Sequence, residues 1–231
     1  MTTVVLFDID GTLLLTGGAG RTAMEAALEA TFGSRGPAGY RYDGKTDRLI
    51  VRESMRAAGV ADALIDARMD ETLDRYLAGL ATQLADPARA ARALPGVSPL
   101  VEAVDAAEDL VLGLLTGNVV AGAALKLASA GLRHERFVVG AYGSDHEERP
   151  RLAPVAQARA AAQLGREIPG DRIVIIGDTP ADLTCGRGIG ARAIGVATGS
   201  YGRAELEGYD AHAIVDDLSD TAMLLEVIRG A

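Results

Sequence analysis

The sequence predicts an α/β fold in which a doubly wound parallel sheet, with a Rossmann-like core, carries an inserted all-helical cap domain. Short apolar segments rich in Val, Ile and Leu recur along the chain, and helix-like segments separate most of them. Continuous apolar strands are typical of a sheet covered on both faces, and strands that alternate with helices are typical of parallel pairing. One interval, residues 16–94, breaks this alternation and is dominated by the helix-favouring residues Ala, Leu, Met, Arg and Glu.

The core elements follow from these segments in chain order. Strands are expected at residues 4–7, 110–115, 137–139, 172–176, 193–196 and 213–215. Helices are expected between them at residues 119–130, 153–164 and 181–189. These elements assign residues 1–15 and 95–231 to the α/β core.

The interval 16–94 contains no convincing strand. Its helical patterns lie at residues 19–31, 46–58 and 61–84. Gly17 and Gly18 at one end, and the Leu-Pro-Gly segment at residues 94–96 at the other, are typical of hinges. We therefore expect residues 16–94 to form a helical cap domain inserted after the first strand.

Composition and charge limit the classes of function. A chain of 231 residues corresponds to roughly one and a half domains at ~150 residues each, which suits a core with an insert. Lys and Arg number 23 and Asp and Glu number 32, so the net charge is −9 and neither nucleic acid nor a membrane is an expected partner. A single cysteine, Cys185, and an N-terminal segment without basic residues predict a cytoplasmic protein. The sequence leaves open whether it is a monomer or a homodimer.

Polar residues follow three of the expected strands. Residues 8–12 read Asp-Ile-Asp-Gly-Thr, residues 116–118 read Thr-Gly-Asn, and residues 177–182 read Gly-Asp-Thr-Pro-Ala-Asp. Ligands bind beyond the carboxyl ends of the strands in an open parallel sheet. These polar groups are therefore expected to converge on one crevice.

The chemistry of that crevice follows from its carboxylates. Asp8, Asp10, Asp178 and Asp182 would repel one another unless a cation neutralised them, and Mg²⁺ prefers oxygen ligands of this kind. Of the first two aspartates, one can attack an electrophile and the other can donate and later accept a proton. Thr116 and the backbone N–H groups around Gly117 and Asn118 can hold anionic oxygens at the start of a helix. The pattern predicts phosphoryl transfer through an aspartyl phosphate.

These three segments resemble the first, second and fourth motifs of the haloacid dehalogenase superfamily, in the same order. The helical insert is similar to the cap of phosphoglycolate phosphatase-like members, and the Gly-Lys-Thr-Asp segment at residues 44–47 resembles a segment of such caps. The resemblance implies a helical cap over a Rossmann-like core and a phosphatase activity on a small phosphorylated metabolite, with Mg²⁺ as cofactor.

The resemblance also implies a role for each matching residue. Asp8 would be the nucleophile and a Mg²⁺ ligand, and Asp10 would be the general acid and base with its backbone carbonyl on the metal. Thr116, with Gly117 and Asn118, would bind the phosphoryl group. Asp178 would be a metal ligand, and Asp182 would support the metal site. Dehalogenases of the superfamily lack an aspartate at the position of Asp10, which favours a phosphatase or phosphomutase here.

The third motif of the family usually supplies a lysine ahead of a helix, and this chain has arginines there. Matching Pro154 and the following helix places Arg151 at the lysine position, with Arg149 as the alternative. Only Lys45 and Lys126 are lysines. Lys45 is either a surface residue or a substrate contact from the cap, and Lys126 is expected on a solvated helix face.

The predicted function is a Mg²⁺-dependent phosphatase that hydrolyses a small organic phosphate monoester. Three alternatives stay open on the sequence alone. A phosphomutase of the same family would pass the phosphoryl group to another hydroxyl. A catalytically weak protein would bind phosphate compounds with little turnover, and a phospho-receiver module would use the same acidic cluster with Mg²⁺. The cap argues against the last, because it suits the enclosure of a small molecule.

Overall fold

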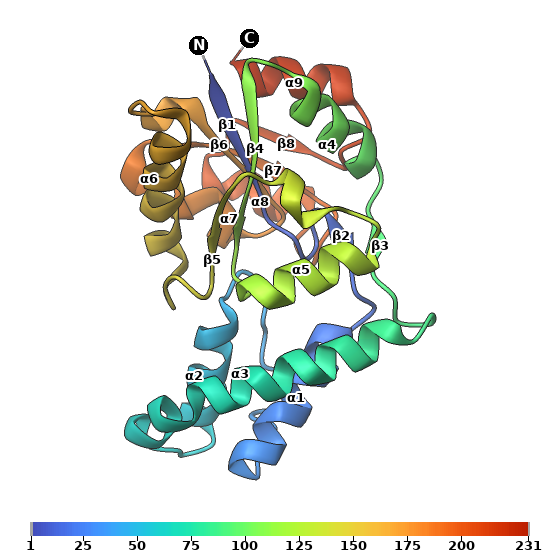
Figure 1. Ribbon diagram of the computed structural model, residues 1–231, viewed down its shortest axis with the longest axis vertical. Helices are drawn as coiled ribbons and strands as arrows, with labels where there is room; N and C mark the ends of the chain where they lie inside the picture. Colours follow the sequence, from blue (N-terminus) through green and yellow to red (C-terminus); the bar gives the residue numbers. More distant parts are fainter. Residues whose placement is uncertain (1, 231) are drawn as a thin grey trace.

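A parallel sheet of six strands, in the order β5-β4-β1-β6-β7-β8, forms the centre of the computed structural model, which describes residues 2–230. The strands are β1 (Thr3–Phe7), β4 (Leu110–Thr116), β5 (Val139–Tyr142), β6 (Ile173–Gly177), β7 (Arg192–Val196) and β8 (Ala213–Val215). Figure 1 shows β1 and β4 running from the end of the molecule that carries the chain termini towards a separate group of helices. The predicted doubly wound sheet with a helical cap is confirmed.

Helices cover both faces of the sheet. On one face α4 (Val97–Ala106), α5 (Val120–Ser129) and α9 (Thr221–Arg229) pack with apolar side chains of β1 and β4 such as Val5 and Leu112. On the other face α6 (Leu152–Leu164) and α7 (Pro180–Cys185) pack against the alternate residues, such as Leu6 and Ile175. Burial on both faces explains why the strands read as continuous apolar segments.

Short elements complete the core. Leu206 of α8 (Arg203–Leu206) packs with Leu183 and Ala193 beside the end of the sheet. Five 3₁₀ turns lie at His134–Arg136, Arg149–Arg151, Gly170–Arg172, Arg187–Ile189 and Glu207–Tyr209. Within residues 2–230, none of the helices combines the length and apolar character needed to cross a membrane.

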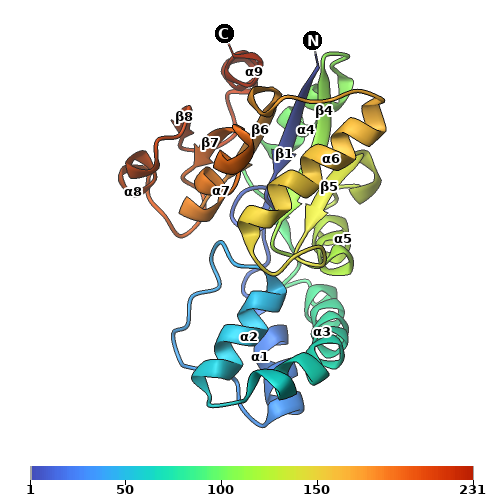
Figure 2. The same cartoon turned by 90° about the vertical axis from the view of Figure 1, so that its left-hand side faces the viewer.

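Three further helices form the cap: α1 (Ala19–Phe32), α2 (Asp47–Ala57) and α3 (Asp62–Ala85). They lie together beyond the carboxyl ends of the strands (Figures 1 and 2). Buried apolar side chains on each, such as Leu28, Met55 and Met69, join them to one another. The α5 helix of the core lies between the sheet and α3 (Figure 1).

The structure corrects three details of the sequence interpretation. The helix expected at residues 181–189 ends at Cys185, and a separate 3₁₀ turn follows at Arg187–Ile189. Residues 16–94 were expected to hold no strand, but β3 (Arg92–Ala93) pairs antiparallel with β2 (Leu14–Leu15) where the chain enters and leaves the cap. Two residues are too few for an apolar pattern, and their partner lies far away in the sequence. The third core strand begins at Val139 rather than at residue 137, because Phe137 still closes the preceding 3₁₀ turn.

The topology places β1 in the middle of the sheet, between β4 and β6. The chain passes from β1 to β4 and outward to β5, then crosses to β6 on the other side of β1. A crevice opens where the strand order reverses in this way. The carboxyl ends of β1, β4 and β6 therefore face the same space, between the sheet and the cap.

Candidate active site

A cavity of about 530 Å³ lies between the sheet and the cap. Asp8, Asp10 and Thr116 line it from the core, and Tyr42 and Lys45 line it from the cap. Its position at the strand reversal and its mixed walls are typical of small-molecule sites.

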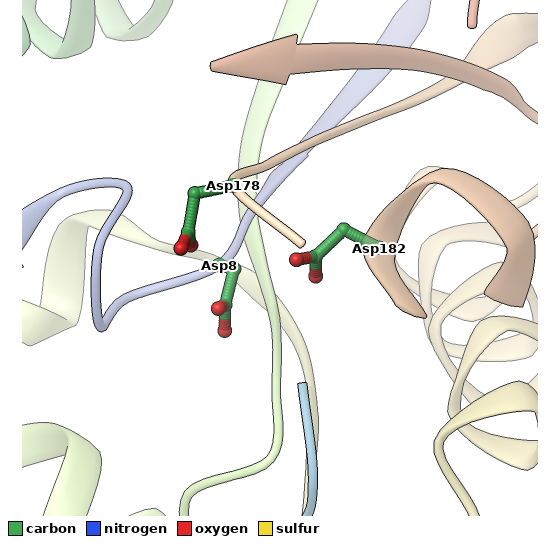
Figure 3. Close-up of side chains that lie close together, drawn as sticks. All are labelled: Asp8, Asp178 and Asp182. Atoms are coloured by element: carbon green, nitrogen blue, oxygen red, sulfur yellow. The ribbon is translucent and has the colours of Figure 1, made fainter. Parts of the chain in front are cut away.

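Three buried carboxyl groups meet beside this cavity (Figure 3): Asp8 follows β1, Asp178 follows β6, and Asp182 lies in α7. Asp8 and Asp178 line the cavity. One oxygen atom from each lies within 4.8 Å of the others. We call these residues the aspartate cluster. The sequence predicted that these three residues and Asp10 would converge on one crevice. Asp10 also lines the cavity, but its carboxylate bonds to Lys126 and Asn118 and does not join the cluster.

The Asp8 carboxylate has a buried cationic partner, since its Oδ1 lies 3.0 Å from Nη2 of Arg149. Burial raises the pKa of Asp8 to about 6; Arg149 opposes this rise, while Asp182 and Asp10 add to it. A carboxyl group in such a place gains from a nearby positive charge, because it then stays ionised and nucleophilic at neutral pH.

Asp178 sits in a tight backbone cradle. Its Oδ1 accepts a hydrogen bond of 3.0 Å from the Thr12 hydroxyl. A Cβ atom at Gly11, whose φ is +85°, would lie 2.3 Å from Asp178 Oδ2, and one at Gly199 would lie 1.8 Å from it. Burial, with Asp182 and Asp8 nearby, raises the pKa of Asp178 well above its usual value. Two glycines are needed for the carboxylate to reach this position.

The donor set suits a hard divalent cation. The aspartate cluster offers only carboxylate oxygens, and its members repel one another without a counter-charge. Burial, and after it the neighbouring carboxylates, raise the pKa of both Asp8 and Asp178, and a bound cation would favour their ionised forms. These two residues fit the role of metal ligands.

Asp182 is already bonded through both oxygens. Its Oδ2 accepts hydrogen bonds from the Thr179 backbone N–H (3.0 Å) and hydroxyl (2.6 Å), and its Oδ1 accepts one from Arg149. The bonds to Thr179 form a capping box at the start of α7. Asp182 therefore orients Arg149 and fixes the start of α7. Within the cluster it supports the site through these bonds.

The arginine beside the cluster is Arg149, and the assignment of Arg151 was wrong. The Arg149 side chain is 5% exposed and bridges Asp8 and Asp182, whereas that of Arg151 is 69% exposed and faces Glu148 at 3.7 Å. Both lie in one 3₁₀ turn, in which residues two apart point about 120° away from each other. Only one of them can enter the site.

Thr116, Gly117 and Asn118 also meet at the cavity. The Thr116 hydroxyl accepts hydrogen bonds from the Asn118 side chain (2.8 Å) and backbone N–H (3.3 Å), so it retains its own hydrogen to donate. The Asn118 N–H is thus engaged within the loop. A Cβ at Gly117 would lie 2.1 Å from the carbonyl oxygen of Lys45, because the cap rests on this loop.

Lys126 was expected on a solvated face, and this expectation was wrong. Its side chain is 6% exposed, and Nζ lies 2.7 Å from Asp10 Oδ2 and 2.6 Å from Asn118 Oδ1. Burial lowers the pKa of Lys126, but Asp10 and the other acidic groups around it raise it by more, so it lies above the usual value. The spacing from the buried Ala123 and Leu127 could have placed Lys126 on the inner face of α5.

The cap contacts the core through the start of α2. The Asp47 backbone N–H donates to the Gly117 carbonyl, and the Val119 N–H donates to Asp47 Oδ2, each over 2.8 Å. Thr46 and Arg52 bind Glu147 of the core at 2.6 and 2.5 Å. From the sequence, Asp47 was expected only as part of a cap segment, because nothing local predicts a partner 72 residues away.

Lys45 is neither a free surface residue nor fully buried. Its Nζ lies 2.6 Å from both Glu53 Oε2 and the Tyr40 hydroxyl, and it stands over the Tyr40 ring. It lines the cavity beside Arg21, whose guanidinium stacks over Tyr42. The cap thus presents cations and aromatic rings to the cavity.

The buried Asp47 carboxyl makes stability depend on pH. Burial raises the pKa of Asp47 to about 6, above its usual 3.8, with Lys126 opposing the rise. The stabilisation by its protonated form is complete below pH 3.8 and is lost as pH rises through 6. Asp47→Asn keeps the acceptor for Val119 but cannot ionise. We expect its free energy of unfolding, relative to that of wild type, to be about 1 kcal/mol higher at pH 7.5 than at pH 5.

Urea unfolding of both proteins at the two pH values measures this change. Asp70→Asn, at a cap carboxylate that is 92% exposed, is the matched control and should show no such gain. An equal difference at both pH values for Asp47→Asn would contradict the assignment of a raised pKa.

Known proteins were compared with the chain on sequence and on structure. A family model for haloacid dehalogenase-like hydrolase matches residues 5–187. No curated protein sequence matches the chain.

Solved structures match it closely in shape. A hydrolase from Pseudomonas syringae is 24% identical, with 99% of each chain covered and a TM-score of 0.72. CbbY from Rhodobacter sphaeroides, in complex with phosphate, is 20% identical over 95% of this chain and 96% of that one, with a TM-score of 0.68. A predicted phosphoglycolate phosphatase from Haemophilus somnus 129pt is 16% identical over 97% and 98%, with a TM-score of 0.65. At these identities the likeness shows the shared fold.

Proposed function

The chain belongs to the haloacid dehalogenase-like hydrolase family, and from this premise we propose that it is a Mg²⁺-dependent phosphatase acting on a small organic phosphate monoester. The observation that carries the proposal is the pair of carboxylates after β1. Asp8 is buried beside Arg149, and Asp10, two residues later, is 43% exposed on its side chain and faces the cavity. The two environments suit two different roles.

Asp8 is the nucleophile of the proposed reaction. Its carboxylate oxygen forms a bond to phosphorus while the bond from phosphorus to the leaving oxygen breaks, and Asp10 gives its proton to that oxygen. Water then attacks phosphorus, Asp10 takes a proton from it, and the bond from Asp8 to phosphorus breaks. Inorganic phosphate and free enzyme result.

Charge on the phosphoryl oxygens is met by donors of this chain. The Thr116 hydroxyl has a hydrogen to give, and Arg149 Nε has no hydrogen-bond partner among the described residues. Fixed donors in a water-poor site stabilise charge that develops in the transition state. Asp8 and Asp178 would hold Mg²⁺, which when bound supplies Lewis-acid stabilisation of the same charge.

The substrate is proposed to be a small phosphorylated metabolite with a further polar or anionic group. The cavity volume of about 530 Å³ suits a metabolite rather than a polymer. Lys45 and Arg21 on the cap side can meet a second negative group. A phosphomutase remains the second candidate, because cations line the cavity both from the core (Arg149 and Lys126) and from the cap (Lys45 and Arg21), which suits two phosphate groups. A CbbY variant has been solved with a ligand of that kind, xylulose-(1,5)bisphosphate.

The test is phosphate release from small phosphate monoesters, including p-nitrophenyl phosphate, with Mg²⁺ and with a chelator. We expect release that disappears in the chelator and returns with added Mg²⁺. An Asp178→Asn variant should need at least about tenfold more Mg²⁺, because it removes one charged ligand. A rate that is the same in Mg²⁺ and in chelator would refute the metal dependence, and stimulation by a sugar bisphosphate would favour the mutase.

A further inference from the structure

Lys126, Asn118 and Asp10 form a closed triangle of hydrogen bonds at the cavity. Lys126 Nζ donates to Asp10 Oδ2 (2.7 Å) and to Asn118 Oδ1 (2.6 Å), and Asn118 Nδ2 donates to Asp10 Oδ2 (2.8 Å). Asn118 also donates to the Thr116 hydroxyl (2.8 Å). Each of the three side chains is therefore oriented by the other two.

The burial of Lys126 needs a reason, because an ammonium group is costly to remove from water. Its backbone belongs to α5, so its position is set by a helix that packs on the sheet. Asp10, in contrast, lies beyond the end of β1 and next to Gly11, where the chain turns. The α5 helix, through Lys126, thus holds the carboxylate of Asp10, which lies on a turn.

We propose that Lys126 is a positioning residue for proton transfer: with Asn118 it fixes the Asp10 carboxylate from one side and directs its other oxygen towards the leaving group. Both donors contact Oδ2, so rotation of the carboxylate would break two bonds at once. The inference rests on the proposed phosphatase function.

Direct binding of the substrate phosphate by Lys126 is a less suitable role. Its ammonium group has three N–H donors, of which two are used by Asp10 and Asn118. Arg149, beside Asp8, retains a free Nε instead. Each carboxylate after β1 therefore has its own buried cation, Arg149 for Asp8 and Lys126 for Asp10.

The experiment is a double-mutant cycle between Lys126→Met and Asp10→Asn. For an alkyl phosphate, whose leaving group needs a proton, we expect Lys126→Met to lower kcat about 100-fold with KM changed by less than about threefold. In the Asp10→Asn background the same substitution should change kcat by less than about threefold, because its route of action is already removed. The substrate p-nitrophenyl phosphate has a good leaving group, nitrophenolate, which needs no proton. With this substrate Lys126→Met should release a burst of nitrophenolate before a slow steady state.

Controls separate the possible failures. Arg229→Met, which breaks an exposed pair with Asp109, should leave kcat unchanged. If Lys126→Met does not fold, as judged by its unfolding temperature, Lys126→Gln takes its place. Equal losses in both backgrounds, or a raised KM with unchanged kcat, would overturn the positioning role. Wild type without Asp8-dependent turnover would instead remove the phosphatase function and this inference with it.

Discussion

An Asp8→Asn variant is expected to lose phosphatase turnover by about 10⁴-fold or more, because the amide cannot form the bond to phosphorus. The substitution is isosteric, and Asp8 is buried with a pKa raised to about 6, so a neutral side chain suits the site. The fold should therefore persist. Phosphate release by wild type and variant, purified in the same way and at matched concentration, measures the loss.

Two further measurements give this result its meaning. The unfolding temperature of Asp8→Asn must stay near that of wild type, so that loss of activity is not loss of fold. Asp8→Glu is a second variant that keeps the charge but moves it, and it should also be inactive. Turnover that survives in Asp8→Asn would remove Asp8 from the role of nucleophile.

Replacing Arg149 by Met is expected to destabilise the protein by about 3–5 kcal/mol, because Asp8 and Asp182 would lose their shared buried cation. For a chain of this length that corresponds to a fall in Tm of about 10 °C. Thermal unfolding at pH 7.5 measures it. The activity should also fall, since the same guanidinium stands beside the nucleophile.

The matched control lies two residues away. Arg151→Met removes an identical side chain that is 69% exposed, and it should change stability by less than about 0.5 kcal/mol. Arg149→Lys keeps the charge and should recover part of the lost stability, although a single ammonium cannot reproduce the fork of a guanidinium. Equal effects of the two Met substitutions would contradict the structural role given to Arg149.

The sequence predicted the features that depend on local pattern and on topology. Apolar strands reveal a covered sheet, and the parallel order alone brings the ends of β1 and β6 together, so Asp8 and Asp178 could be placed in one site. The choice between Arg149 and Arg151 depended on the direction of side chains in one tight turn, which sequence spacing does not contain.

The contacts of two other residues were not predicted from the sequence, for different reasons. Lys126 was judged by its charge, although its position in α5 between Ala123 and Leu127 indicated burial. The contact of Asp47 with Val119 joins cap and core over a long sequence separation, so no window of the sequence reports it. A charged residue can be buried only where tertiary contacts supply its partners, and a single sequence does not reveal those contacts.

The two lysines of this chain both line the cavity, and every other basic side chain, apart from the histidines, is an arginine. Amine chemistry on the side chains is therefore confined to the candidate site. Biosynthetic incorporation of lysine labelled with ¹³C in its side chain would introduce labelled NMR signals at Lys45 and Lys126 alone. One signal would report on the cap and the other on the core, so a ligand that brings the two together can be followed without any engineered label.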